Sequence, residues 1–143
     1  MNKKYILALF FVSLLGFYSS MLAFGNNNDK IHQLTILNTN DVHGRLESFQ
    51  YSKNAPFVGG IAARAGVINK IKQKEENVLL LDAGDIASGT LFYRVFNGTP
   101  DIKFMSEIGY DAAELGNHEF DKGTDVLYRM VNVAKFPFLC ANI

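Results

Sequence analysis

Cysteine is nearly absent from this sequence of 143 residues, since Cys140 is its single example. One cysteine cannot form a disulfide within the chain, and it excludes zinc sites that are built from several cysteines. An excess of either charge is also missing, because 14 lysine and arginine residues balance 14 aspartate and glutamate residues. The overall charge therefore gives no indication of a nucleic-acid polymer or an anionic membrane surface as the partner.

Internal repeats and low-complexity tracts are also missing, and the composition is that of an ordinary globular protein. The residues are 48% hydrophobic and 20% charged, which excludes a disordered or collagen-like polymer. The length leaves room for a single domain. Information about function must therefore come from short motifs.

The first 25 residues have the pattern of a signal peptide. Lys3 and Lys4 give a positively charged start, and residues 5–18 are almost uninterrupted apolar sequence. Residues 23–25 then offer small side chains at the two positions that signal peptidase recognises. The alternative is an uncleaved membrane anchor, but serines in the run and the polar linker over residues 26–32 favour cleavage. We therefore expect an exported protein (periplasmic, cell-surface or secreted) with no stable membrane insertion after cleavage.

The remaining residues, 33–143, alternate between short apolar runs and segments with helical periodicity. The expected strands are residues 34–37, 78–81, 112–115 and 136–141. The expected helices are residues 61–71, 101–108 and 123–133. Thr99 and Pro100 would begin the second helix and Gly109 would end it, whereas the first strand would be buried on both faces. This alternation predicts an α/β fold with a mostly parallel sheet and right-handed crossovers.

Polar residues follow each of the four expected strands. Asp41 and His43 follow the first strand, and Asp85 follows the second. The third strand leads into residues 116–121, which read Gly-Asn-His-Glu-Phe-Asp, and the fourth ends at Asn142. Because ligands of open α/β sheets bind beyond the carboxyl ends of the strands, we expect these residues to form one site.

The side chains at these strand ends suit metal ions. Asp41 and His43 are two residues apart, and a carboxylate with an imidazole suits zinc, manganese or iron(II). Asp85 has two oxygens that can bridge two ions about 3.5–4 Å apart. Asn117 would give a neutral oxygen to the second ion, and His118 beside it would be able to donate a hydrogen bond to a phosphate oxygen.

Other polar residues near these strand ends are not interpreted as metal ligands. Asp121 follows His118 by three residues and would hold its imidazole in one tautomer. We interpret Asp82 as structural, Glu119 as a residue of a helix start and His32 as solvated. Each ligand candidate taken alone also has a simple alternative, such as a turn, a helix cap or a surface histidine. Their joint occurrence favours the metal site.

Four blocks of this sequence, in order, resemble those of the calcineurin-like metallophosphoesterases. The blocks are residues 40–45 (NDVHGR), 59–64 (GGIAAR), 84–90 (GDIASGT) and 116–121 (GNHEFD). The glycine pair and the spelling of the last block resemble the exported 5′-nucleotidase branch, which includes UDP-sugar hydrolases and 2′,3′-cyclic-nucleotide phosphodiesterases. The resemblance implies an α/β fold that is the first half of a four-layer α-β-β-α metallophosphoesterase sandwich, truncated.

The resemblance also implies an activity and a set of ligands. The activity is metal-dependent hydrolysis of nucleotides or related phosphoesters, by in-line attack of a water activated by two divalent ions (Zn, Mn, Fe, Co or Mg). Asp41 and His43 would bind the first ion, and Asp85 would bridge the two. Asn117 would bind the second ion.

Two further residues receive catalytic roles from the resemblance. His118 would stabilise the phosphate in the transition state, and Asp121 would orient it. Members of the family add later histidines, a glutamine and a C-terminal domain that binds the base. We therefore expect residues 33–143 to be the N-terminal part of a longer catalytic domain that is inactive by itself. The alternative is a non-catalytic exported binding module that keeps the fold without the later metal ligands.

Overall fold

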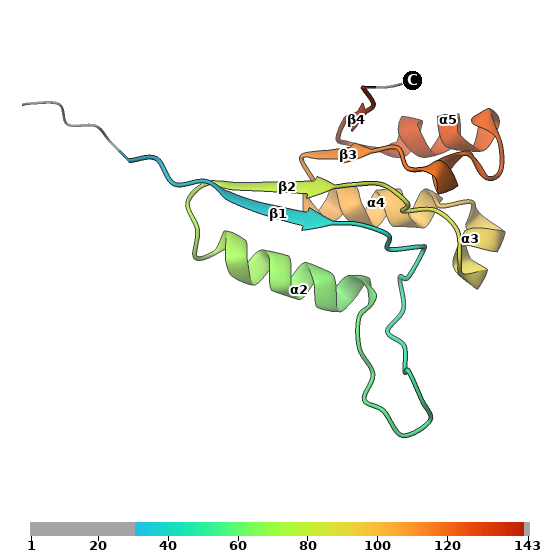
Figure 1. Cartoon of the computed structure of the whole chain (residues 1–143), viewed down its shortest axis with the longest axis horizontal. Coiled ribbons are helices and arrows are strands. Elements are labelled where there is room, and N and C mark those ends of the chain that lie inside the picture. Colours follow the sequence, from blue (N-terminus) through green and yellow to red (C-terminus); the bar gives the residue numbers. More distant parts are fainter. Residues whose placement is uncertain (1–30, 142–143) are drawn as a thin grey trace, which may run out of the picture. The chain divides into compact units, whose positions relative to one another are not determined.

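The computed structural model describes residues 31–141 of the chain. The expected signal peptide at residues 1–25, most of the linker that follows it, and Asn142 lie outside the described residues. Over residues 31–141, no helix is both long enough and apolar enough to cross a membrane. Residues 33–141 form an α/β unit around one four-stranded sheet (Figure 1).

The four strands are parallel and follow one another across the sheet in sequence order. They are β1 (Thr35–Thr39), β2 (Val78–Asp82), β3 (Ala112–Glu114) and β4 (Phe138–Leu139). β1 and β2 pair over their full length, with Thr35 opposite Val78 and Thr39 opposite Asp82. The predicted parallel α/β fold is thus confirmed, although the fourth strand is shorter than the expected residues 136–141.

Helices connect each strand to the next. They are α2 (Gly60–Lys72), α3 (Leu91–Phe96), α4 (Thr99–Ile108), the 3₁₀ helix η1 (Asn117–Phe120) and α5 (Thr124–Val133). As predicted, α4 has Pro100 in its first turn and ends at Gly109, whose φ is 82°. α3 was not predicted, because six residues are too few to reveal helical periodicity. It begins where the Thr90 side chain accepts a hydrogen bond of 3.2 Å from the backbone N–H of Tyr93.

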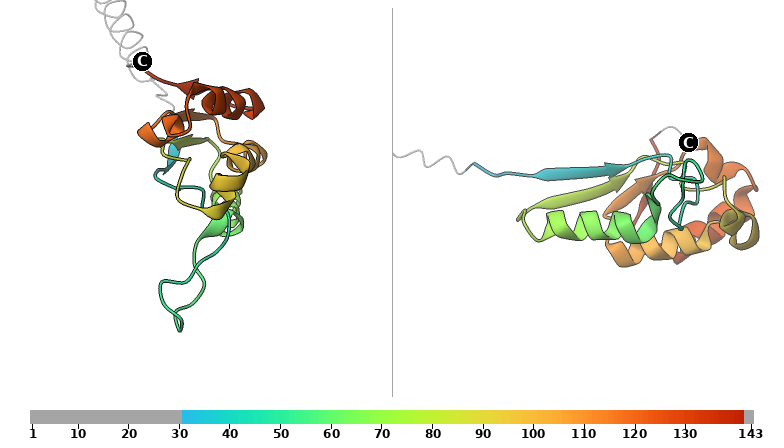
Figure 2. Two further views of the ribbon diagram at one scale, coloured as in Figure 1. Left: turned by 90° about the vertical axis from the view of Figure 1, so that its right-hand side faces the viewer. Right: turned by 90° about the horizontal axis from the view of Figure 1, so that it is seen from below.

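The long helices lie on one face of the sheet (Figure 2). Each right-handed crossover advances one strand in the same direction, so every connection passes over that face. The core between the sheet and α4 includes Leu80 of β2 and Ile102 and Met105 of α4, whose side chains are fully buried. On the other face, Ile36 of β1 is 59% exposed and Leu139 of β4 is 58% exposed. The prediction that the first strand is buried on both faces is therefore wrong for this chain.

Candidate metal and catalytic site

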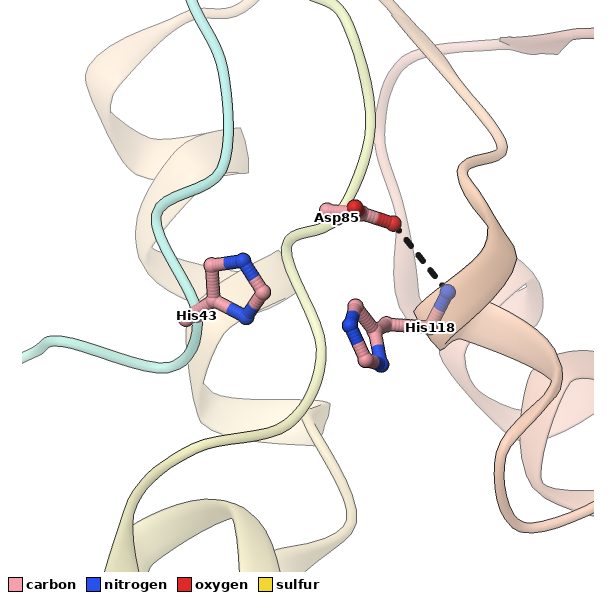
Figure 3. A group of neighbouring side chains, drawn as sticks. All are labelled: His43, Asp85 and His118. Carbon is pink, nitrogen blue, oxygen red and sulfur yellow. Dashed lines mark hydrogen bonds between the residues drawn. The ribbon is translucent and has the colours of Figure 1, made fainter.

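Three loops at the carboxyl edge of the sheet bring together the side chains of His43, Asp85 and His118 (Figure 3). These residues follow β1, β2 and β3, and each offers one ligand atom that lies within 4.8 Å of the other two. The two imidazole rings meet edge to face, with their centroids 5.0 Å apart. The backbone N–H of His118 donates a hydrogen bond of 3.1 Å to Oδ1 of Asp85. One predicted residue from each of these three strand ends thus takes part in one cluster.

The loop after β1 is fixed to the loop after β2 by backbone hydrogen bonds. The N–H of Asp41 donates to the carbonyl of Gly84 (3.1 Å), and the N–H of His43 donates to the carbonyl of Asp85 (3.1 Å). One residue further, the N–H of Gly44 donates to the carbonyl of Ile86 (2.8 Å). These bonds hold the two loops side by side beyond the end of the sheet, so the relative positions of the candidate ligands are set by the backbone.

An unusual backbone conformation marks the same two loops. Asp41, His43, Asp85 and Ser88 have φ values of 53°, 47°, 54° and 82°, in the left-handed region that favours glycine. Among residues 31–141, Asn97 is the one other non-glycine residue with a positive φ. Each such conformation costs about 1–3 kcal/mol and persists where the surrounding structure enforces it, which is typical of functional sites.

A buried carboxylate ties the loop after β2 to the loop after β3. The side chain of Glu119 in η1 is fully buried and accepts three backbone hydrogen bonds. Its donors are the N–H groups of Asp85 (3.0 Å), Ala87 (2.8 Å) and Gly116 (2.7 Å). Glu119 does lie at a helix start, as the sequence suggested, but it also joins two parts of the site. The sequence shows that Glu119 directly follows His118, but this position does not indicate that the Glu119 side chain is buried.

Two glycines allow the loops after β2 and β3 to approach closely. A Cβ atom added to Gly116 would lie 2.2 Å from Oδ1 of Asp85, and one added to Gly84 would lie 2.6 Å from the backbone nitrogen of Gly116. Gly84 also has a φ of 93°, whereas the φ of Gly116 is an ordinary −82°. A larger residue at Gly116 could therefore keep the same backbone conformation, but its Cβ atom would overlap the Asp85 carboxylate.

Asp82, at the end of β2, is structural as predicted. It is 3% exposed, and its carboxylate accepts hydrogen bonds from the Thr39 hydroxyl and from the backbone N–H of Gly84. Burial raises the pKa of the Asp82 carboxyl, and the hydrogen bonds from Thr39 and Gly84 partly oppose that rise. Because Gly84 precedes Asp85, Asp82 helps to hold the turn that presents Asp85. His32 is exposed, in line with its interpretation as a solvated residue.

The pair formed by Asp41 and His43 fits a shared metal ion. Nε2 of His43 lies 3.3 Å from Oδ1 of Asp41. Two ligand atoms with bonds of about 2.1 Å to one tetrahedral ion lie about 3.4 Å apart. Mixed nitrogen and oxygen donors are accepted by zinc, manganese and iron(II). The donor types and their separation therefore suit the ion that the sequence predicts here.

His118 also contacts Asp121, the partner expected from the sequence spacing. Nδ1 of His118 lies 2.7 Å from Oδ2 of Asp121. The hydrogen bond to Asp121 is the largest cause of a raised pKa for the His118 imidazole, and the carboxylates of Asp85 and Glu119 add smaller effects. With Nδ1 engaged, Nε2 is the ring nitrogen left for a ligand. The position of His118 near Asp85 and His43 is compatible with contact to an ion or to a phosphate.

Asn117 directly precedes His118 of the cluster in the chain. It begins η1 between Gly116 and His118, and its side chain is exposed. Its assignment as a ligand of the second ion thus stays a prediction. Ser88 is the reverse case, because the sequence analysis assigned it no role and its hydroxyl lies 2.9 Å from Nδ1 of His43.

Comparison with known proteins supports this architecture. Residues 34–142 match the family model described as calcineurin-like phosphoesterase. The 5′-nucleotidase of Bos taurus is 45% identical over 117 residues, which make up 78% of this chain and 20% of that protein. The structure of a 5′-nucleotidase precursor from Thermus thermophilus has a TM-score of 0.71 and 38% identity, covering 76% of this chain and 22% of that one. For the NAD nucleotidase of Haemophilus influenzae the TM-score is 0.70 and the identity 36%, with 76% of this chain and 20% of that one covered.

The family match includes the whole site. It runs from residue 34 to residue 142 and so contains every candidate site residue from Asp41 to Asp121. The chain spans about a fifth of the length of the curated relatives that it matches. By this match and by its fold, the chain belongs to the calcineurin-like phosphoesterase family, in the branch that contains the 5′-nucleotidases.

Proposed function

We propose that the protein containing this chain is a metal-dependent phosphoester hydrolase that acts on nucleotides. The observation that carries the proposal is the convergence of His43, Asp85 and His118 within 4.8 Å at the carboxyl edge of the sheet. Family membership gives the class of reaction, and the names of the relatives, 5′-nucleotidases and an NAD nucleotidase, suggest the class of substrate.

The side chains of the three loops divide into two groups in this proposal. Asp41, His43, Asp85 and Asn117 would hold two divalent ions, with Asp85 contributing to both. Such ions supply a water of lowered pKa as the nucleophile and neutralise charge on the phosphate. The backbone bonds between the loops keep these side chains in place before any ligand arrives, which lowers the cost of organising the site.

His118 and Asp121 form the second group. The contact of Asp121 with Nδ1 leaves Nε2 of His118 as the donor to a phosphate oxygen. A donor of this kind stabilises the negative charge that builds on the transferring group, so it acts mainly in the transition state. The carboxylate of Asp121 favours the protonated imidazole, and this is the form that donates from Nε2 while Nδ1–H stays bound to Asp121.

Phosphate release from AMP in the presence of Mn²⁺ tests the proposal. The protein containing this chain should release phosphate, and chelation of divalent ions should abolish the release. Asp85→Asn should lose activity and bound metal more severely than Asp41→Asn, because Asp85 would contact both ions. Asp125→Asn is a matched control, since it removes the same charge from an exposed position in the first turn of α5.

Three results would count against the proposal. They are activity that survives exhaustive chelation, full metal retention in Asp85→Asn, and bound metal without release of phosphate from any nucleotide. The last of these would favour the alternative of an exported binding module.

We further propose that the protein is exported. The support is the sequence pattern of residues 1–25, with its basic start, apolar run and small residues before the expected cleavage site. Mass spectrometry of the secreted or periplasmic protein should find an N-terminus near Asn26. An intact Met1 would contradict cleavage.

A further inference from the structure

Ser88 lies in the loop after β2, three residues beyond Asp85, and its side chain contacts His43 of the site. Its Oγ atom is 2.9 Å from Nδ1 of His43, the other ring nitrogen being Nε2. Nε2 is the nitrogen that lies 3.3 Å from Asp41. The His43 ring is thus held between a hydroxyl on one nitrogen and a carboxylate on the other.

The residue that makes this contact has a strained backbone conformation. Its φ of 82° lies in the left-handed region, where a residue with a side chain is disfavoured. Glycine tolerates this conformation freely, and Gly89 next to it already has a φ of 86°. A serine in such a position therefore suggests that its hydroxyl is needed, because the turn itself would be formed more easily by glycine.

The two loops pack closely on both sides of this contact. A Cβ atom on Gly89 would lie 2.9 Å from the carbonyl oxygen of His43, and one on Gly44 would lie 2.9 Å from the carbonyl oxygen of Ser88. The Thr90 hydroxyl also donates a hydrogen bond of 2.9 Å to the carbonyl oxygen of Gly44. Ser88 and His43 are therefore fixed relative to each other by the main chain on both sides of their contact.

We propose that Ser88 is a positioning residue for the first metal ion, acting through His43. When Nε2 binds the ion shared with Asp41, Nδ1 carries the proton and Oγ of Ser88 accepts it, and this contact orients the ring so that the Nε2 lone pair faces the ion. This inference rests on the proposed function, since it requires an ion at Asp41 and His43.

Mn²⁺ binding to the protein that contains this chain, followed by electron paramagnetic resonance, tests the role of Ser88. Ser88→Gly removes the hydroxyl and relieves the backbone strain, and it should weaken Mn²⁺ binding by about 10-fold or more, the scale of losing the hydrogen-bond partner of a metal-ligating histidine. Ser88→Asn should recover part of the affinity, because asparagine tolerates the left-handed region and carries an acceptor oxygen. Ser106→Ala is the control, since it removes a part-buried hydroxyl that bonds to the Ile102 carbonyl in α4.

A purely structural role predicts a different pattern. If Ser88 only formed the turn, Ser88→Gly would bind Mn²⁺ as tightly as the parent chain and would be at least as resistant to thermal unfolding. That result, with normal binding by the parent, would overturn the inference and leave the proposed function intact. Absence of Mn²⁺ binding by the parent protein that contains this chain would overturn both.

Nitrogen NMR of the histidine rings in the protein loaded with diamagnetic Zn²⁺ gives a second readout. With Nε2 on the ion, His43 carries its proton on Nδ1 and should donate it to Ser88. In Ser88→Gly, the Nδ1 resonance should shift and its proton should exchange faster with water. An unchanged resonance and exchange rate in Ser88→Gly would also overturn the inference.

Discussion

Nδ1 of His118 and Oδ2 of Asp121 lie 2.7 Å apart across one turn of the 3₁₀ helix η1. This helix has three residues per turn, so side chains three residues apart lie on the same side. An α-helix at this position would rotate the two side chains further from each other. The short helix therefore places His118 and Asp121 on the same side of the segment that follows β3.

The first prediction tests whether His118 stabilises the transition state without binding a metal ion. His118→Asn should reduce kcat by roughly 10²–10³-fold, the scale of losing one donor to a developing charge. Asp121→Asn should cost less, because His118 would still reach the phosphate from a less ordered position. Both variants should bind Mn²⁺ as the parent does, which is measured by metal content. Loss of an ion from His118→Asn, with normal kcat in the loaded fraction, would instead identify His118 as a ligand.

The second prediction uses the close approach of Gly116 to Asp85. Gly116→Ala would place a Cβ atom 2.2 Å from Oδ1 of Asp85 and 2.6 Å from its backbone nitrogen, so the carboxylate and the loop that carries it must move. Mn²⁺ affinity should fall by at least about 10-fold, as expected when a ligand loses its position. Gly66→Ala is the control, because a Cβ atom there meets nothing within 4 Å and Gly66 lies inside α2.

Gly66→Ala should retain Mn²⁺ binding and raise the free energy of unfolding by about 0.5–1 kcal/mol. Equal Mn²⁺ affinity in Gly116→Ala and the parent would show that the Asp85 carboxylate is free to occupy another position without loss of the ion.

The grouping of the site residues was predictable because it depends on strand order alone. Once the sequence indicates parallel strands, the residues after β1, β2 and β3 must meet at one edge. This is why Asp41, His43, Asp85 and His118 were expected together and why the first, third and fourth of the blocks in the family resemblance fall at strand ends. The expectation needed no knowledge of loop conformation.

The contacts of Ser88 and Glu119 were not predictable in the same way. Both depend on loops whose backbone leaves the regular regions, and hydrophobic periodicity carries no information about such loops.

The exposure of Ile36 has another cause. An apolar run reveals that a strand is hydrophobic, but the direction of all the crossovers decides which face the helices of this chain cover.

The third prediction tests the buried carboxylate that joins the loops after β2 and β3. In Glu119→Gln, an NH₂ group replaces one oxygen and faces at least one of the backbone N–H groups that now bind Glu119. An unsatisfied buried donor costs about 1–3 kcal/mol, so the free energy of unfolding should fall by that amount or more. Denaturant unfolding measures it. The exposed Glu107, which pairs with Lys135, is the control, and Glu107→Gln should leave stability nearly unchanged. Equal effects of the two substitutions would contradict the role of Glu119.

The last prediction concerns Asp101 in α4, a buried carboxyl outside the site. Asp101 is 2% exposed, and burial raises its pKa from 3.8 to about 6, although its own backbone N–H and the charge of Arg64 lower it somewhat. Between these two values the folded state binds a proton more tightly than the unfolded state. The free energy of unfolding should therefore be largest below the lower value, fall as the pH rises through this window, and level off above about 6.

The size of this fall follows from the two pKa values and is at most about 3 kcal/mol. Burial of Asp82 acts in the same direction, so some decrease should remain when Asp101 is replaced. Asp101→Asn removes the ionised form and should raise the free energy of unfolding near neutral pH by about 1–3 kcal/mol, with a flatter dependence on pH. The gain is limited because the substitution also removes the favourable interaction between the Asp101 carboxylate and the charge of Arg64. Denaturant unfolding at a series of pH values measures both effects, and Asp125→Asn, at an exposed position, should keep the full decrease. A steep decrease that persists unchanged in Asp101→Asn would assign it to other groups.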